Sequence, residues 1–169
     1  AFGCKYTMTN PSDKDNILGL SGAALMPSAE NPMTGKPVIY LYPEKNTDVN
    51  VQLDFKGQLT YTFPTYNGGW NVTAQPDGTL TNKSDGSTHY YLFWDGNPDR
   101  RDWDFSTGFV LKNTELEGFF KENLPKLGLL PREYNDFITY WVPILSKNPY
   151  TVLNFSTVQY EETAPLTVT

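Results

Sequence analysis

The chain has 169 residues, a formal net charge of -6 and 15% aromatic residues. A chain of this length can bury about 68–70% of its unfolded surface, so we expect one domain with a real core and no need for disulfide bonds. The acidic balance argues against a nucleic-acid partner, because phosphate binding needs clustered lysines and arginines. We expect no membrane span, since no apolar run approaches the roughly 20 residues that a span requires.

Residues 1–35 are predicted to be an extended, irregular N-terminal arm. The segment is rich in Asn, Pro, Ser and Gly and shows no sustained periodicity. The segment also contains apolar side chains, which a disordered tail would not usually carry and which need a surface to cover them. The arm residues that we expect to be buried in this way are Ile17, Leu18, Leu20, Leu25 and Met26. The arm would cover either its own domain or the sheet edge of a neighbouring subunit.

The segment KPVIYLYP at residues 36–43 marks the start of a single folded domain that runs to residue 169. Five residues in a row, Val38 to Tyr42, are β-branched, aromatic or leucine, and a proline stands on each side. Such a run is too short for a helix and predicts a strand that is buried on both faces.

An antiparallel meander is predicted after this strand. Residues 48–55 alternate between apolar and polar side chains, which indicates a strand with one wet face. A tight turn at Lys56 and Gly57 should lead into a partner strand, in which Leu59, Tyr61 and Phe63 share one face. Shorter strands are expected at residues 70–75, 79–81 and 88–94.

Two amphipathic helices are predicted next. Thr114 and Glu117 have the spacing of a capping box, and apolar residues follow at helical spacing until Gly128. A second helix should begin at Pro131, and Pro143 should kink or end it. Strands are expected at residues 150–157 and 166–169. The predicted fold class is therefore α+β, a sandwich-like antiparallel sheet with two helices inserted before the C-terminal strands.

Several blocks resemble a set of uncharacterised, exported bacterial proteins. These blocks are KPVIYLYP at residues 36–43, YLFW at 91–94, PREYNDF at 131–137 with Tyr140 and Trp141, and NPY at 148–150. The similarity covers the chain from residue 36 to the C-terminus. It implies an extracellular or cell-surface location, and it carries over no activity and no site residue.

No catalytic residues are predicted. His89 is the only histidine and Cys4 the only cysteine, so the chain cannot assemble a zinc site of the Cys/His type. A nucleophile pair of Cys4 with His89 is disfavoured, because a hydrogen-bonded structural role suits a histidine at the start of a core strand. Glycoside hydrolysis needs two carboxylates, and the strand and helix acids fall on polar faces.

One calcium site is a hypothesis. Asp95, Asn97 and Asp99 have the oxygen-ligand spacing that opens a calcium-binding loop. Arg100 stands where an EF-hand requires glycine, and Ser106 stands where it requires glutamate. An ordinary polar turn is the alternative, and no other cofactor is expected.

Three sequons place Asn71, Asn82 and Asn154 as candidate glycosylation sites. We expect Asn71 and Asn154 on outward-facing strand positions and Asn82 in a turn.

Two classes of function remain. The first is a non-catalytic structural or assembly protein of the cell surface that self-associates, into a filament or a smaller oligomer, through its arm. The alternative is a carbohydrate- or ligand-binding module with exposed aromatics as stacking platforms, such as Tyr66, Tyr90 or Trp103. A glycoside hydrolase is the weaker alternative. A row of exposed aromatics would favour binding, and an arm on a neighbouring subunit would favour assembly.

Overall fold

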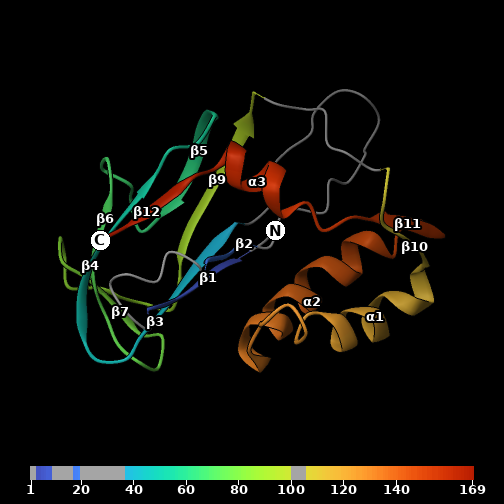
Figure 1. The fold of residues 1–169 in the computed structure, drawn as a ribbon, viewed down its shortest axis with the longest axis horizontal. Helices are drawn as coiled ribbons and strands as arrows, with labels where there is room; N and C mark the ends of the chain where they lie inside the picture. Colours follow the sequence, from blue (N-terminus) through green and yellow to red (C-terminus); the bar gives the residue numbers. More distant parts are fainter. Residues whose placement is uncertain (1–2, 9–16, 20–36, 100–105) are drawn as a thin grey trace.

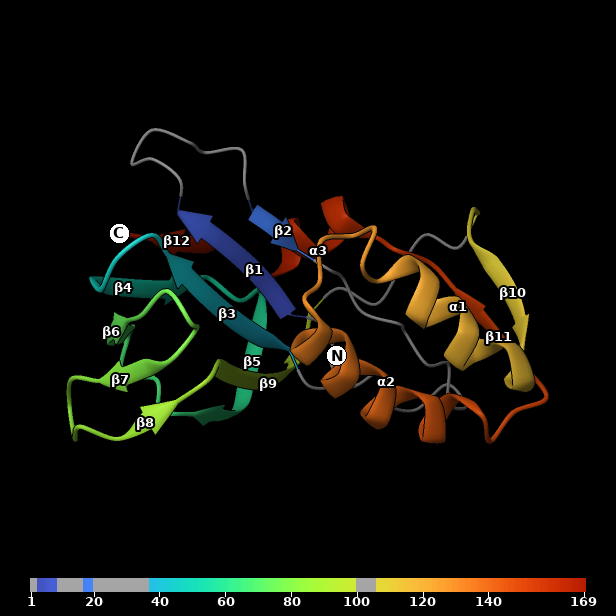
Figure 2. The ribbon, with the colours of Figure 1, turned by 90° about the horizontal axis from the view of Figure 1, so that it is seen from below.

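Two β-sheets at one end of the molecule and a pair of helices at the other make up the fold (Figure 1, Figure 2). The computed structural model describes residues 3–8, 17–19, 37–99 and 106–169. The predicted α+β class is confirmed, with the two long helices placed before the C-terminal strands. None of the described helices combines the length and the hydrophobicity that crossing a membrane requires.

The first sheet has the strand order β2-β1-β3-β9-β5. Its strands are β1 (Gly3–Met8), β2 (Ile17–Gly19), β3 (Val38–Pro43), β5 (Gly57–Phe63) and β9 (Leu92–Pro98). β1 runs parallel to β3, and the other pairs are antiparallel. The central place of β3 agrees with its apolar sequence, and Val38, Ile39, Tyr40 and Leu41 are all buried.

The second sheet has the strand order β12-β4-β6-β7-β8. Its strands are β4 (Thr47–Leu53), β6 (Trp70–Ala74), β7 (Leu80–Asn82), β8 (Thr88–His89) and β12 (Leu166–Val168). The sandwich core lies between the two sheets. It includes Ile39, Leu41, Val49, Val51, Leu53, Trp70, Val72, Ala74, Leu80, Leu92 and Trp94. The alternation predicted for β4 is confirmed by its buried valines and leucine.

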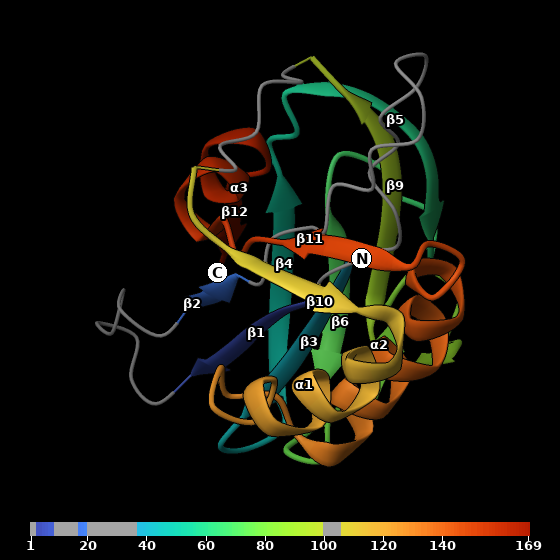
Figure 3. The same cartoon turned by 90° about the vertical axis from the view of Figure 1, so that its right-hand side faces the viewer.

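The helices form a second core. α1 (Leu116–Asn123) follows the short 3-10 helix η1 (Asn113–Glu115), and α2 (Pro131–Leu145) packs against it. A two-stranded sheet of β10 (Phe109–Lys112) and β11 (Tyr150–Leu153) lies beside these helices (Figure 3). This core contains Leu116, Phe120, Leu124, Phe137, Ile138, Trp141, Leu145 and Leu153.

The predicted hairpin of residues 48–63 is wrong, because β4 and β5 lie in different sheets. The chain between them pairs instead with the segment before β12. Asp54 N–H donates to Pro165 O and Lys56 N–H donates to Thr163 O. These hydrogen bonds occupy the backbone that a tight turn would have used, so the chain crosses from one sheet to the other.

Other local predictions are also corrected. The capping box precedes the predicted one by two residues, with the Lys112 N–H donating to the Glu115 carboxylate. The strand expected at residues 150–157 ends at Leu153, and α3 (Thr157–Thr163) follows. α3 places Tyr160 against Trp94 in the sandwich core, and that burial favours a helix over a longer strand. Pro143 lies two residues before the end of α2.

The arm is less irregular than predicted, because β1 and β2 are strands. β1 pairs along its whole length with β3, whose edge would otherwise present unpaired N–H and C=O groups. The described part of the arm therefore lies on its own chain. The domain boundary at residue 36 stays a prediction.

Candidate functional site

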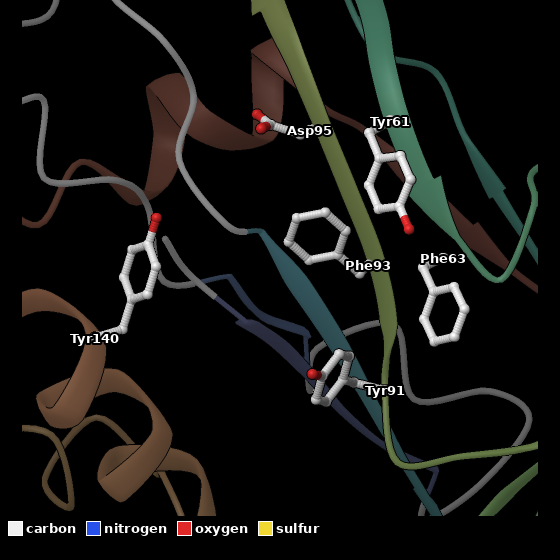
Figure 4. A pocket seen from close by; sticks show the side chains of 6 residues that line it. All are labelled: Tyr61, Phe63, Tyr91, Phe93, Asp95 and Tyr140. Carbon is white, nitrogen blue, oxygen red and sulfur yellow. The ribbon is translucent and has the colours of Figure 1, made fainter.

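The outer face of the first sheet, which points away from the sandwich core, carries the candidate site. Residues of β5 and β9, with Tyr91 just before β9, line an open cavity of about 380 Å³, and one residue of α2 lies across from them (Figure 4). The lining residues are Tyr61, Phe63, Tyr91, Phe93, Asp95 and Tyr140. We call this cavity the aromatic cleft.

A β-bulge in β5 directs its aromatic side chains into the cleft. Leu59 and Tyr61 pair with consecutive residues of β9, so Thr60 is an extra residue in β5. A bulge of this kind moves the side chains that follow it to the opposite face of the sheet. Leu59 contacts the core, whereas Tyr61 and Phe63 lie on the outer face. The prediction that these three residues share one face is wrong for this reason.

The aromatic rings of the cleft are unusually exposed. Tyr61 is 59% exposed, Phe63 is 49% exposed and Tyr140 is 39% exposed. The ring centroids of Tyr61 and Phe93 are 5.9 Å apart, and their planes differ by 57°. The rings therefore form a cupped surface and not a flat row. Contiguous exposed apolar surface of this kind on a folded domain marks an interaction site.

Asp95 supplies the charge in the cleft. Its Oδ1 atom accepts a hydrogen bond of 2.8 Å from the Gly96 N–H, which fixes the orientation of the carboxylate. Burial raises the pKa of the Asp95 carboxyl above its usual value, and the hydrogen bond from Gly96 opposes that effect. The side chain is only half-buried, so it can reach a ligand.

Hydrogen bonding between β3 and α2 fixes the far wall of the cleft. The Tyr40 hydroxyl donates to Asp136 Oδ2 at 3.2 Å. Burial, together with the Asp136 and Glu133 carboxylates, raises the pKa of the Tyr40 phenol above its usual range. Tyr140 follows Asp136 by four residues, about one helical turn, so the two side chains share one side of α2. This contact therefore holds Tyr140 opposite the sheet.

Glu133 is the most deeply buried acid among the described residues, at 2% exposure. Its Oε2 atom accepts a hydrogen bond of 2.7 Å from the Leu130 N–H and caps α2. Its Oε1 atom has no hydrogen-bond partner among the described residues. Burial, and then the Glu133 carboxylate, raises the pKa of the Tyr42 phenol. The position of Glu133 favours a role in joining α2 to the sheet.

The candidate calcium ligands do not form the predicted loop. Asp95 and Asn97 lie in β9, where residues on one face are spaced by about 6.6 Å along the strand, and Asp99 lies just beyond it. Among the residues that the structure describes, no three Asp, Glu, His or Cys side chains gather to hold a metal. Of the three candidates, only Asp95 lines the cleft. The calcium site stays a prediction without geometric support.

The three sequons differ in their surroundings. Asn71 is exposed on β6, where its Oδ1 accepts a hydrogen bond from Asn50 Nδ2 at 2.8 Å. Asn82 is only 8% exposed, and its Oδ1 accepts hydrogen bonds from the N–H and the hydroxyl of Ser84. Asn154 is half-buried after β11. The accessibility predicted for Asn82 is therefore not supported, whereas Asn71 remains accessible.

The arm residues are described only in part. Ile17 and Leu18 lie in β2, which pairs with β1 of the same chain. Leu20, Leu25 and Met26 lie outside the described residues. The backbone of Cys4 lies in β1 and that of His89 in β8, in different sheets. The His89 ring is 2.7 Å from the Ser87 hydroxyl, which agrees with the structural role predicted for this histidine.

Of the aromatics predicted as stacking platforms, the two that the structure describes, Tyr66 and Tyr90, do not line the cleft. The Tyr66 hydroxyl donates to Leu53 O, and its ring packs on Trp70 beside the core. Tyr90 is exposed beneath the guanidinium of Arg132, 3.8 Å from the ring centroid. Trp103 lies outside the described residues.

Asp95 was predicted as a site residue, though as a calcium ligand, whereas the five aromatic residues that line the cleft were missed by sequence reasoning. Residues 88–94 were predicted as a strand with aromatic side chains on both of its faces. That pattern is the signal in the sequence that could have pointed to Tyr91 and Phe93.

Comparison with known proteins identified one curated relative. The chain is 46% identical over 83 residues to the "Uncharacterized protein in bglA 3'region" of Butyrivibrio fibrisolvens. The aligned part is 47% of this chain and 84% of that protein, whose name states no activity. No family model matches the chain. No solved structure matches it either.

Proposed function

Because the chain belongs to the family of this uncharacterised Butyrivibrio fibrisolvens protein, which has no stated activity, we propose a function from the aromatic cleft alone. The chain is a carbohydrate-binding module. It holds a sugar chain between the aromatic side chains of β5 and β9 on one side and Tyr140 of α2 on the other.

The observation that carries this proposal is the set of exposed rings on a rigid sheet. A sugar ring presents apolar C–H faces that cover aromatic rings, and its hydroxyls can bond to carboxylates and phenols at the rim. The cleft combines both kinds of group, because Asp95 and the phenols of Tyr61, Tyr91 and Tyr140 lie among its apolar walls. Ligand sites are commonly built in this way, from an apolar lining with a few polar groups.

The lining of the cleft favours sugar binding over sugar hydrolysis. Glycosidases use two carboxyl groups that lie about 5–9.5 Å apart across the scissile bond. Among the described residues that line the cleft, Asp95 is the one carboxylate. Asp136 is engaged by Tyr40 and does not line the cleft.

Isothermal titration with a panel of soluble hexasaccharides tests the proposal, and the chain offers a matched control. Tyr61 in the cleft and Tyr150 on β11 are both 59% exposed. We expect Tyr61→Ala to weaken binding at least about fivefold, because each ring contributes on the order of 1–3 kcal/mol through its buried area. Tyr150→Ala should leave the affinity unchanged. A wild-type chain that binds no hexasaccharide contradicts the proposal, and so do equal effects of the two variants.

Self-assembly is a second proposal, favoured by the outer face of the β10–β11 sheet (Figure 3). Val110 and Val152 lie directly opposite each other there and are 69% and 49% exposed. Exposed apolar cross-strand pairs are typical of docking surfaces. Since β1 pairs with β3 of its own chain, assembly through the arm would require strand exchange between subunits.

Size-exclusion chromatography with light scattering tests the assembly proposal. The full chain should form multimers that dissociate when residues 1–33 are deleted or when Val152→Lys is introduced. A full chain that stays monomeric at high concentration argues against assembly, as do multimers that persist in both variants. An extracellular location accompanies both proposals as a prediction.

A further inference from the structure

The aromatic cleft has one charged side chain among its lining residues, and that charge is negative. Asp95 is the carboxylate, and the other lining residues are phenols and phenyl rings. Lysine, arginine and histidine are all absent from the described lining. An anionic ligand would find no cationic side chain among the described lining residues and would be repelled by Asp95.

The Asp95 carboxylate has bonding capacity left for a ligand. Its Oδ1 accepts the Gly96 N–H, and no hydrogen bond or ion pair from another described residue engages its Oδ2. A half-buried carboxylate that no described side chain neutralises is unfavourable, because the protein surroundings solvate it less well than water does; burial accordingly outweighs the opposing effects of the Gly96 N–H and the N-terminal charge on its pKa. A ligand that brings a positive charge to Oδ2 would compensate for that loss.

The rings around Asp95 favour a cation for a separate reason. Aromatic faces carry partial negative charge and attract cations within about 6 Å of the ring centroid. Tyr61 pairs with Asp95 across the two strands, and the Phe93 ring lies 5.9 Å from the Tyr61 ring. A positively charged group bound at Asp95 would therefore also contact aromatic surface.

The length of the cleft calls for a ligand larger than one amine. Tyr91 directly precedes β9 and Asp95 lies within it, and four residues of extended chain span about 13 Å. Only one end of this span carries the carboxylate. The ligand must therefore combine a cationic group at one position with covering groups for the aromatic rings along the rest.

We infer that the cleft binds an oligosaccharide that carries free amino groups, with one ammonium group against Asp95 and the neighbouring sugar rings against the aromatic side chains. This inference rests on the proposed carbohydrate-binding function and names its ligand class. Asp95 is then the residue that determines specificity.

Three hexasaccharides with the same backbone test the inference, because they differ only in one substituent per sugar. They are built from glucosamine, N-acetylglucosamine or glucose, and the titration uses a mildly acidic buffer in which the amine is protonated. We expect the glucosamine oligomer to bind at least about fivefold more tightly, since charge-assisted hydrogen bonds are roughly twice as strong as neutral ones and the neighbouring aromatic rings also attract the cation. Asp95→Asn keeps an oxygen for the Gly96 N–H and should abolish the preference. Asp99→Asn, an exposed control just beyond β9, should keep it.

The outcomes separate the two proposals. Equal binding of the three oligomers overturns this inference and leaves the carbohydrate-binding function standing, as does a preference that survives Asp95→Asn. No binding of any of the three by the wild-type chain overturns both.

A salt series on the wild-type protein gives a second readout that does not depend on the folding of a variant. Affinity for the glucosamine oligomer should fall as ionic strength rises, and affinity for the glucose oligomer should not. A salt-independent affinity for the glucosamine oligomer overturns the inference.

Discussion

Replacing Tyr40 by phenylalanine removes a single hydroxyl from the junction between β3 and α2. Tyr40 is buried, and its hydroxyl donates to Asp136 Oδ2 at 3.2 Å. The ring also contacts the rings of Tyr42 and Tyr91, and phenylalanine retains those contacts. The variant therefore isolates the hydrogen bond that holds Tyr140 opposite the sheet.

The expected loss of stability follows from the partner's charge and exposure. A hydrogen bond to a charged group contributes about 1.5–3 kcal/mol. Asp136 is half-buried, so water can partly replace the lost donor, and we expect a loss of about 1–2 kcal/mol in the free energy of unfolding. For a domain of this size that loss lowers the melting temperature by about 3–6 °C.

Urea denaturation of Tyr40→Phe, Asp136→Asn and the double variant measures the interaction itself. We expect a coupling energy of about 1 kcal/mol between the two sites, and the exposed Tyr150→Phe serves as a control without effect. A coupling energy within about 0.3 kcal/mol of zero would refute the reasoning.

The Tyr40→Phe variant should also differ from the wild type in how its stability depends on alkaline pH. The pKa of the Tyr40 phenol is raised in the folded state, whereas the unfolded chain releases that proton near pH 10. The contribution of Tyr40 to stability is therefore fully present below about pH 10 and declines above it, by about 1.4 kcal/mol per pH unit. Tyr40→Phe removes this decline, so its stability deficit relative to wild type should narrow above about pH 10. A deficit that stays constant between about pH 8 and 11 contradicts the assignment.

Three further predictions concern the bulge, the buried acid and the sequons. Deleting Thr60 should keep the fold, because the pairing of β5 with β9 then becomes continuous. Deleting Thr62 should lower the free energy of unfolding by about 1–3 kcal/mol more, because it turns Phe63 toward the core, and thermal unfolding of both deletions checks this. Glu133→Gln should change the free energy of unfolding by less than about 0.5 kcal/mol, because it removes a buried charge and keeps the hydrogen bond that caps α2. Glu133→Ala removes that hydrogen bond and should cost about 2–4 kcal/mol, as measured by urea unfolding. Folded protein secreted from a glycosylating host should carry glycan on Asn71 and none on Asn82, as peptide mass analysis will show.

Local patterns in the sequence determined the elements whose signal repeats over several residues. The apolar run of β3 predicted a buried strand, since no polar residue interrupts it and prolines limit its length. The alternation in β4 and the apolar stripe of α2 likewise matched the periods of a strand and a helix. These features depend on neighbours in the chain, so the sequence alone could establish them.

Strand partners and the faces of β5 were decided only by the tertiary structure. Alternation tells which side chains share a face, but it does not tell which strand or sheet lies beside them. Residues 54–56 pair with a segment more than 100 residues later, and that pairing sent β5 to the other sheet. One extra residue at Thr60 then reversed the faces of the residues that follow, which no periodicity in β5 reveals.

The aromatic cleft likewise exists only in the folded molecule. Its walls come from β5, β9 and α2, and Tyr140 is about 45 residues away from Asp95 in the chain. Each of these residues reads as ordinary strand or helix surface in its own segment. The hydrogen bond from Tyr40 to Asp136 fixes α2 against β3 and leaves the neighbouring strands of the same face uncovered. Local sequence does not predict such a site, because its residues come close together only when the helical core packs beside the first sheet.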